Sequence, residues 1–152
     1  KVALVSDAGT PGISDPGFRL IRDCLEKNVD VRPIPGVTAV ITALSVSGAP
    51  TDKFLYLGFI PVKKGRKTLL ESLPEESRTI VLYESVHRIV KTLEDLYNNL
   101  GDRYVCVGRE MTKMYEEFFR GKLSKAVDHF ESQKNKGEFV VVIAPENYDI
   151  DL

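Results

Sequence analysis

The sequence has 152 residues, enough for one ordinary domain or two small ones. Hydrophobic residues make up 43% and charged residues 28%, which is typical of a globular chain and excludes a disordered one. The net charge is −1, so the chain lacks the basic excess by which proteins coat nucleic acid non-specifically, although a local basic patch is compatible with it.

No apolar run is long enough to span a bilayer, and we expect no signal peptide. We therefore expect no membrane contact and a cytoplasmic protein. The two cysteines, Cys24 and Cys106, lie far apart in apolar segments. They predict buried free thiols in a reducing compartment, in preference to a disulfide.

The first third of the chain predicts strands alternating with helices. Residues 2–5 indicate a buried strand, and because the chain begins inside it we expect a piece of a longer protein. Residues 15–27 predict a helix with Asp15 as N-cap. Residues 29–34 predict a second strand, and residues 37–46 a short, nearly all-apolar helix that should be buried.

Residues 48–51 predict a joint, so we divide the chain into a cofactor-binding domain at 1–49 and a second domain at 50–152. After the joint, the expected strands are 54–60, 79–83, 104–107 and 139–144, the expected helices are 63–73, 87–100 and 123–133, and residues 115–119 are ambiguous. This alternation predicts an α/β fold: two small α/β domains with mixed sheets.

The segment from Ser6 to Gly17 is the most unusual one. It holds three glycines, two prolines and two aspartates between a predicted strand and a predicted helix. Ligands bind beyond the carboxyl ends of strands in open α/β sheets, and small residues let them approach the backbone. We expect a ligand loop in which Asp7 accepts hydrogen bonds; the alternative is a plain turn with Asp15 as N-cap. The loop is neither a P-loop nor a GxGxxG fingerprint.

This segment resembles the signature of the ribosomal RNA small-subunit methyltransferase I branch of the tetrapyrrole methylase superfamily. Further matches follow in the same order along nearly the whole chain, at residues 35–39, 50–54, 58–61, 83–85, 87–88, 109–113, 116–118, 120–121 and 136–139. Pro11 and Gly12 stand where the porphyrin-methylating branch has an aromatic residue, which favours the RNA branch. The family's N-terminal strand and glycine-rich loop are missing here, so we expect an incomplete N-terminal domain.

The resemblance implies that S-adenosyl-L-methionine binds in a cleft between the two domains. The positions that match the family's cofactor-binding residues are Asp7, Ala8, Gly9, Thr10, Thr38, Ala39, Tyr83, Glu84, Arg109, Glu110, Gly137 and Glu138. Two of these matches have simpler readings. Thr38 would serve as a helix cap, and Arg109 with Glu110 would be a solvated ion pair.

The implied reaction is 2′-O-methylation of a cytidine ribose in 16S ribosomal RNA, by in-line transfer of the methyl group. A ribose hydroxyl is a poor acid, so a base helps, and the candidates are Glu84, Glu110 and Glu117, which the sequence does not rank. His87 is interpreted as a helix-start residue. No metal-ligand spacing occurs, so no metal is expected.

Basic residues are the expected contacts to the RNA. The candidates are Lys63, Lys64, Arg66, Arg88 and Lys113, with a solvated helix start as the alternative for the cluster at 63–67. The expected partners are small-subunit ribosomal RNA and, because family members are homodimers, a second copy of the chain. Two other functions stay open: a porphyrin methyltransferase of the same superfamily, and a non-catalytic binding module.

Overall fold

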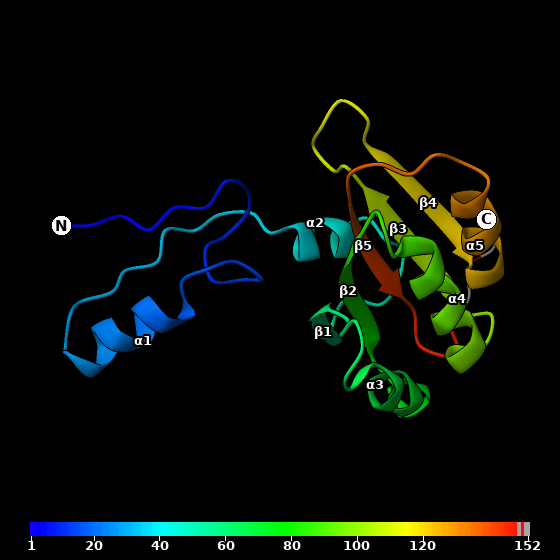
Figure 1. The fold of residues 1–152 in the computed structure, drawn as a ribbon, viewed down its shortest axis with the longest axis horizontal. Helices are drawn as coiled ribbons and strands as arrows, with labels where there is room; N and C mark the ends of the chain where they lie inside the picture. Colours follow the sequence, from blue (N-terminus) through cyan, green and yellow to red (C-terminus); the bar gives the residue numbers. More distant parts are fainter. Residues whose placement is uncertain (149, 151–152) are drawn as a thin grey trace.

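A mixed five-stranded sheet forms the centre of the computed structural model, which describes residues 1–148 and 150 (Figure 1). Its strands are β1 (Phe54–Phe59), β2 (Thr79–Ser85), β3 (Tyr104–Arg109), β4 (Glu117–Lys122) and β5 (Glu138–Ile143). Their order in the sheet is β1-β2-β5-β3-β4. Only β1 and β2 pair in parallel; the other neighbours are antiparallel.

Helices cover both faces of this sheet. They are α2 (Ala39–Ser45), α3 (Arg66–Ser72), η1 (Leu73–Glu75), α4 (Ile89–Leu100) and α5 (Leu123–Glu131), whereas α1 (Phe18–Glu26) lies away from the sheet (Figure 1). Side chains alternate between the faces of a strand. On β2, Ile80 and Leu82 therefore enter the core under α3, α4 and α5, whereas Val81 packs with Val40 and Leu44 of α2 on the other face.

The segment before α2 projects away from the sheet, with α1 at its far end (Figure 1). No residue before Val40 is buried, and α1 buries none of its side chains. The strands expected at 2–5 and 29–34 are not formed, so that prediction is wrong. A strand takes its backbone hydrogen bonds from a neighbouring strand, and in the described part of the chain neither segment has one.

The start of α1 also differs from the prediction. The helix begins at Phe18 with Gly17 as N-cap, at φ 147°, and no side chain caps it. Asp15 is not the N-cap, because it lies two residues before that position, where its side chain is too far back to meet the first free backbone N–H groups.

Beyond residue 38 the predicted elements are confirmed, with their ends shifted by at most three residues. The ambiguous residues 115–119 lead into β4, whose Phe119 pairs with Val107 of β3. The expected short apolar helix is α2, which buries Val40, Ala43 and Leu44. The α/β class is confirmed, whereas the division between residues 49 and 50 stays a prediction, since α2 packs on the sheet of residues 54–143.

Both cysteines are free thiols, as expected. Cys106 is buried and Cys24 is half-buried. Burial raises the pKa of the Cys106 thiol to about 11, so this thiol stays protonated at neutral pH.

No described helix is both long enough and apolar enough to cross a bilayer.

Candidate functional site

The carboxyl ends of β1, β2 and β3 lie at one edge of the sheet, because β2 and β3 both run antiparallel to β5 and β1 runs parallel to β2. The segment from Ser6 to Gly17, here called the first loop, and the start of α2 reach the same edge. Together these segments enclose a cavity of about 550 Å³, lined by residues 8–10, 13–15, 37–39, 42, 59, 83–87, 110–113 and 137–140. Open α/β sheets bind ligands at this kind of edge.

Hydrogen bonds hold the first loop against its neighbours. The Thr10 hydroxyl donates to the Val37 carbonyl at 3.0 Å, which joins the first loop to the segment before α2. The Ser14 and Tyr56 hydroxyls lie 2.6 Å apart, which joins it to β1. Thr38 is the N-cap of α2, since its Oγ1 accepts from the Ile41 N–H at 3.3 Å. Thr38 therefore has its capping role and also lines the cavity.

Tyr83 forms an aromatic wall of the cavity. Its ring packs at 5.4 Å from the Tyr56 ring and 5.7 Å from the Phe59 ring. Its hydroxyl accepts a hydrogen bond from the Val40 N–H at 3.2 Å. Burial, with help from the neighbouring Tyr56, raises the pKa of Tyr83 to about 12, so its hydroxyl stays protonated at neutral pH.

Glu84 reaches the cavity wall, but its buried carboxylate is fully engaged. Oε1 accepts from the Ser85 N–H at 2.7 Å and pairs with Arg88 at 2.8 Å. Oε2 accepts from the Thr92 hydroxyl at 2.7 Å. Arg88 also donates to the Ile60 carbonyl at 3.0 Å, so this pair ties β2 to α4 and to the end of β1.

Glu110, Lys113 and Glu138 form a second charged cluster in the cavity lining. Oε1 of Glu110 accepts from Lys113 Nζ at 2.9 Å and from the Glu138 N–H at 3.1 Å. Lys113 Nζ also reaches Oε2 of Glu138 at 3.0 Å. The Lys113 hydrogen bond lowers the pKa of Glu110, while bonds to Glu110 and then Glu138 raise the pKa of Lys113. Gly137 lies against the Glu110 side chain.

Arg109 and Glu117 lie outside the cavity lining and pair with each other. Arg109 Nη1 is 2.9 Å from Glu117 Oε2, and Arg109 Nε donates to the Lys136 carbonyl at 2.9 Å. Oε1 of Glu117 is 2.6 Å from Nε2 of His129. Burial alone would raise the pKa of Glu117, but the hydrogen bonds from His129 and Arg109 hold it below its usual value. The expected pair of Arg109 with Glu110 is replaced by this one.

The cavity thus gathers most of the predicted cofactor-binding residues, although their roles stay predictions. Those that line it are Ala8, Gly9, Thr10, Thr38, Ala39, Tyr83, Glu84, Glu110, Gly137 and Glu138, and those that do not are Asp7 and Arg109. Asp15 and His87 also line it, although the sequence analysis gave them no role in the site. Their positions in the sequence could have pointed to the site. Asp15 lies in the first loop and His87 lies just after β2, and both segments reach this edge of the sheet.

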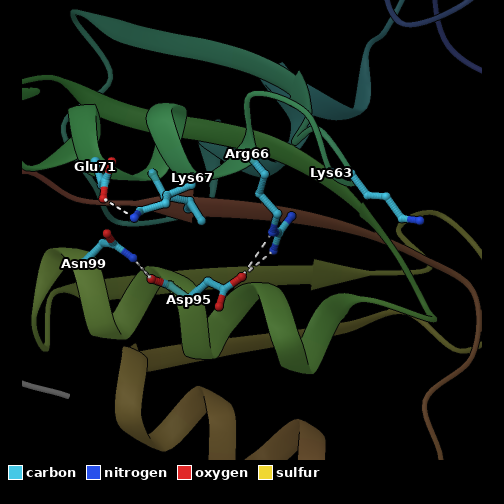
Figure 2. Close-up of a pocket in the computed structure, with 7 residues that line it drawn as sticks. Lys63, Arg66, Lys67, Glu71, Asp95 and Asn99 are labelled. Atoms are coloured by element: carbon cyan, nitrogen blue, oxygen red, sulfur yellow. Dashed lines mark hydrogen bonds and ion pairs between the residues drawn. The ribbon is translucent and has the colours of Figure 1, made fainter.

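Among the predicted substrate-binding residues, Lys113 lines the cavity and the others do not. Lys63, Arg66 and Lys67 border a second, open pocket of about 410 Å³ between α3 and α4 (Figure 2). Arg66 is engaged there by Asp95, at 3.1 Å from Nε and 2.8 Å from Nη2. Lys63 and the exposed Lys64 make no ion pair with the described residues.

No group of three or more His, Cys, Asp and Glu side chains is placed to hold a metal ion in the part of the chain that the structure describes. The polar side-chain groups that line the cavity include carboxylates, one ammonium group, hydroxyls and one imidazole.

Two similar proteins of known sequence have the same name. Ribosomal RNA small subunit methyltransferase I of Thermotoga maritima is 49% identical over 144 residues, which cover 95% of this chain and 65% of that protein. The Synechocystis protein of the same name is 53% identical over 146 residues, which cover 95% of this chain and 52% of that protein. The chain thus spans from about half to just under two thirds of these relatives.

Solved structures share the fold at low identity. The cobalt precorrin-4 methyltransferase CbiF has a TM-score of 0.65 at 21% identity, over 90% of this chain and 61% of that one. The uroporphyrin-III C-methyl transferase of Thermus thermophilus, complexed with S-adenyl homocysteine, has a TM-score of 0.58 at 17% identity, over 88% and 62%. The family model for tetrapyrrole (corrin/porphyrin) methylases matches residues 1–127. The chain therefore belongs to the tetrapyrrole methylase family.

Proposed function

We propose that the protein containing this chain transfers a methyl group from S-adenosyl-L-methionine to the 2′-hydroxyl of a cytidine in 16S ribosomal RNA. The observation that carries this proposal is the identity of 44–53% to relatives named ribosomal RNA small subunit methyltransferase I. The cavity at the sheet edge supports it, since it gathers residues from most of the segments that matched the family signature, although none from 50–54, 116–118 or 120–121.

The cavity suits a nucleoside cofactor of this kind. Its volume of about 550 Å³ lies within the usual range for ligand sites, about 300–1,000 Å³. Gly9 leaves its stretch of backbone open to a ligand, and the aromatic rings of Phe59 and Tyr83 give the cavity an apolar wall. When bound, the cofactor would supply a methyl group activated by a positively charged sulfur.

The residues that would hold it come from three segments of the chain: the first loop at 8–10, the start of α2 at 38–39, and the turn at 137–138 before β5. The acidic side chains of Asp15 and Glu138 give the cavity a negative character that favours a sulfonium group. Walls of this kind would fix the direction from which the ribose approaches the methyl group. Alignment of this kind supplies up to about 7–11 kcal/mol of barrier reduction in the best intramolecular cases.

The contacts of the three candidate bases weigh against all of them. Both oxygens of Glu84 are taken by neighbouring donors, and Glu117 lies outside the cavity in its pair with Arg109. Glu110 lies at the cavity but is neutralised by Lys113. None of the three is a free base at the site.

RNA contacts in this proposal come from Lys113 at the cavity and from Lys63 and Lys64 at the start of α3. Lys63 and Lys64 are exposed, which leaves them available for phosphate oxygens. Arg66 and Arg88 instead position neighbouring elements through Asp95 and Glu84. We further propose, from the family resemblance, that the protein acts as a homodimer in the cytoplasm.

The direct test is transfer of a tritiated methyl group by the complete protein. Small ribosomal subunits lacking the modification, and uroporphyrinogen III, serve as competing acceptors, and calorimetry with S-adenosylhomocysteine reports binding. We expect binding, and label in the ribose of 16S RNA only. Label in uroporphyrinogen would replace the proposal with a porphyrin methyltransferase, and absence of binding would leave a non-catalytic module. Sedimentation of the same sample tests the dimer.

A further inference from the structure

Some of the titratable groups at the cavity already form hydrogen bonds or ion pairs with other residues of the chain, and others do not. They are Asp15, Tyr83, Glu84, His87, Glu110, Lys113 and Glu138. Methylation of a ribose hydroxyl is helped by a group that accepts its proton, and the best acceptors are unprotonated at working pH and have a pKa close to it.

The carboxylates of β2 and of the β3–β4 turn do not meet this requirement. Glu84 accepts hydrogen bonds from Ser85 and Thr92 and forms an ion pair with Arg88. Glu110 and Glu138 share the Lys113 ammonium group. That ammonium group lowers the pKa of Glu110, which makes it a weaker base than an ordinary glutamate.

The two remaining engaged groups are protonated at neutral pH. The pKa of Tyr83 is raised to about 12 by burial and by Tyr56, and its hydroxyl oxygen already accepts from the Val40 N–H. Hydrogen bonds to Glu110 and Glu138 raise the pKa of Lys113. A tyrosine hydroxyl and an ammonium group in these states donate protons and do not accept them.

His87 is placed differently. It lies in the turn between β2 and α4, at the carboxyl end of β2, where the Arg88 N–H donates to the Ser85 carbonyl at 3.0 Å and holds the turn. The residue is exposed and lines the cavity, and its ring makes no hydrogen bond or ion pair with any residue that the structure describes. Its two ring nitrogens are therefore open to a ligand.

Asp15, on the first loop, is the other titratable group of the cavity whose side chain makes no hydrogen bond or ion pair with a described residue. A carboxylate is a much weaker base than a neutral imidazole, which makes the histidine the better proton acceptor of the two. The charged groups around His87 are Glu84 and Arg88 on its own segment, Asp15 on the first loop, Glu110 and Lys113 on the β3–β4 turn, and Glu138 on β5.

We propose that His87 accepts the proton of the ribose 2′-hydroxyl during methyl transfer, an inference that rests on the proposed function. A neutral ring nitrogen of His87 takes the proton as the ribose oxygen forms its bond to the methyl carbon. The carbon–sulfur bond breaks, and its electron pair returns to sulfur, which becomes a neutral thioether. The imidazolium then releases the proton to water.

The test compares His87→Gln with His129→Gln in the complete protein. His129 is the matched control, because it is the chain's other histidine and lies outside the cavity, hydrogen-bonded to Glu117. Single-turnover methyl transfer to small ribosomal subunits is measured from pH 5.5 to pH 9, and S-adenosylhomocysteine affinity is measured by calorimetry. Carbethoxylation of His87, followed by peptide mass spectrometry, gives a readout independent of activity.

We expect His87→Gln to slow transfer by about 10²- to 10⁴-fold, with cofactor affinity changed by less than about twofold. The rise in rate with pH should disappear in this variant and persist in His129→Gln. Bound RNA substrate should protect His87 from carbethoxylation. Loss of cofactor affinity in His87→Gln, a rate within about threefold of wild type, or a persisting rise with pH would each overturn the inference. Failure of the wild-type protein to methylate ribosomal RNA would instead refute the proposed function.

Discussion

Gly137 illustrates how one residue sets the shape of the cavity. Its φ is +86°, and a Cβ placed on it would overlap the carboxylate of Glu110. Glu110 cannot simply turn away, because it is held by Lys113 and by the Glu138 N–H and itself has φ 48°. The left-handed backbone and the close approach therefore both require glycine here.

We expect Gly137→Ala to weaken S-adenosylhomocysteine binding by about tenfold or more, since the Glu110 carboxylate has to move into the cavity. Gly65→Ala is the matched control: Gly65 has φ +84°, but open space surrounds its missing Cβ. Both variants carry the cost of about 1 kcal/mol for a left-handed alanine, so both should melt earlier than wild type. Equal cofactor affinity in the two variants would show that the Glu110 contact does not shape the site.

Glu84 is the clearest case of a buried charge whose partners are all present. Removing one member of a buried pair leaves the other charge without its partner, which costs about 3–5 kcal/mol. Glu84→Ala should therefore lower the free energy of unfolding by about that amount, measured by urea denaturation. Glu71→Ala removes an exposed carboxylate that lies 3.6 Å from Lys67, and it should cost less than about 1 kcal/mol. Similar losses in both variants would contradict this account of Glu84.

The sequence identified these carboxylates but not their partners. Glu117 was a candidate base, and Arg109 was expected beside Glu110, its neighbour in sequence. The two residues pair because they stand opposite each other in the β3–β4 register. That register depends on a strand whose start was ambiguous in the sequence, so no argument from spacing alone could have found the pair.

At the scale of elements, the agreement beyond residue 38 has a physical origin. Val81 and Val105 each lie in an unbroken run of four or five buried residues, and such runs are reliably interpreted as strands. The segments at 2–5 and 29–34 carry the same pattern but stay exposed, with Val2 96% and Ile34 86% exposed. Composition indicates the tendency of a segment to become a strand, but the strand forms only beside a partner.

The first loop depends on one polar link to the sheet. In the described part of the chain, the Ser14–Tyr56 pair is the only side-chain hydrogen bond between residues 1–37 and the sheet. Tyr56→Phe removes it and keeps the ring that packs on Tyr83. A single hydrogen bond contributes about 0.5–1.5 kcal/mol, so we expect S-adenosylhomocysteine affinity to fall by about two- to tenfold.

The control for this link is Tyr97→Phe on α4, where the hydroxyl makes no hydrogen bond to a described residue and does not line the cavity. Calorimetry on both variants, with melting curves, separates a loop effect from a general loss of stability. Unchanged affinity in Tyr56→Phe would show that the loop is positioned by packing alone.

For the whole molecule, shifted pKa values predict how stability depends on acid. Hydrogen bonds from Arg78 lower the pKa of Glu76 to about 2, and the pKa values of Glu110, Glu117 and Asp95 are lowered too. Because these carboxylates bind protons less readily when folded, their contribution is complete above their unfolded values and is lost as pH falls through the folded ones. Urea unfolding should show stability falling from about pH 4.5 towards pH 2, and constant stability over that range would contradict the ion pairs.

At alkaline pH, stability depends on groups whose pKa values are raised in the folded protein. Burial is the main reason that the pKa of Cys106 rises from 9.0 to about 11 and that of Tyr83 from 10.0 to about 12. The unfolded chain then loses these protons before the folded chain does, so stability is complete below about pH 9 and falls as pH rises through the folded values. Tyr83→Phe should reduce the loss above pH 10 and leave the acid limb unchanged, because no carboxylate with a lowered pKa contacts its hydroxyl. An alkaline limb of the same size in that variant would place the titrating group elsewhere in the core.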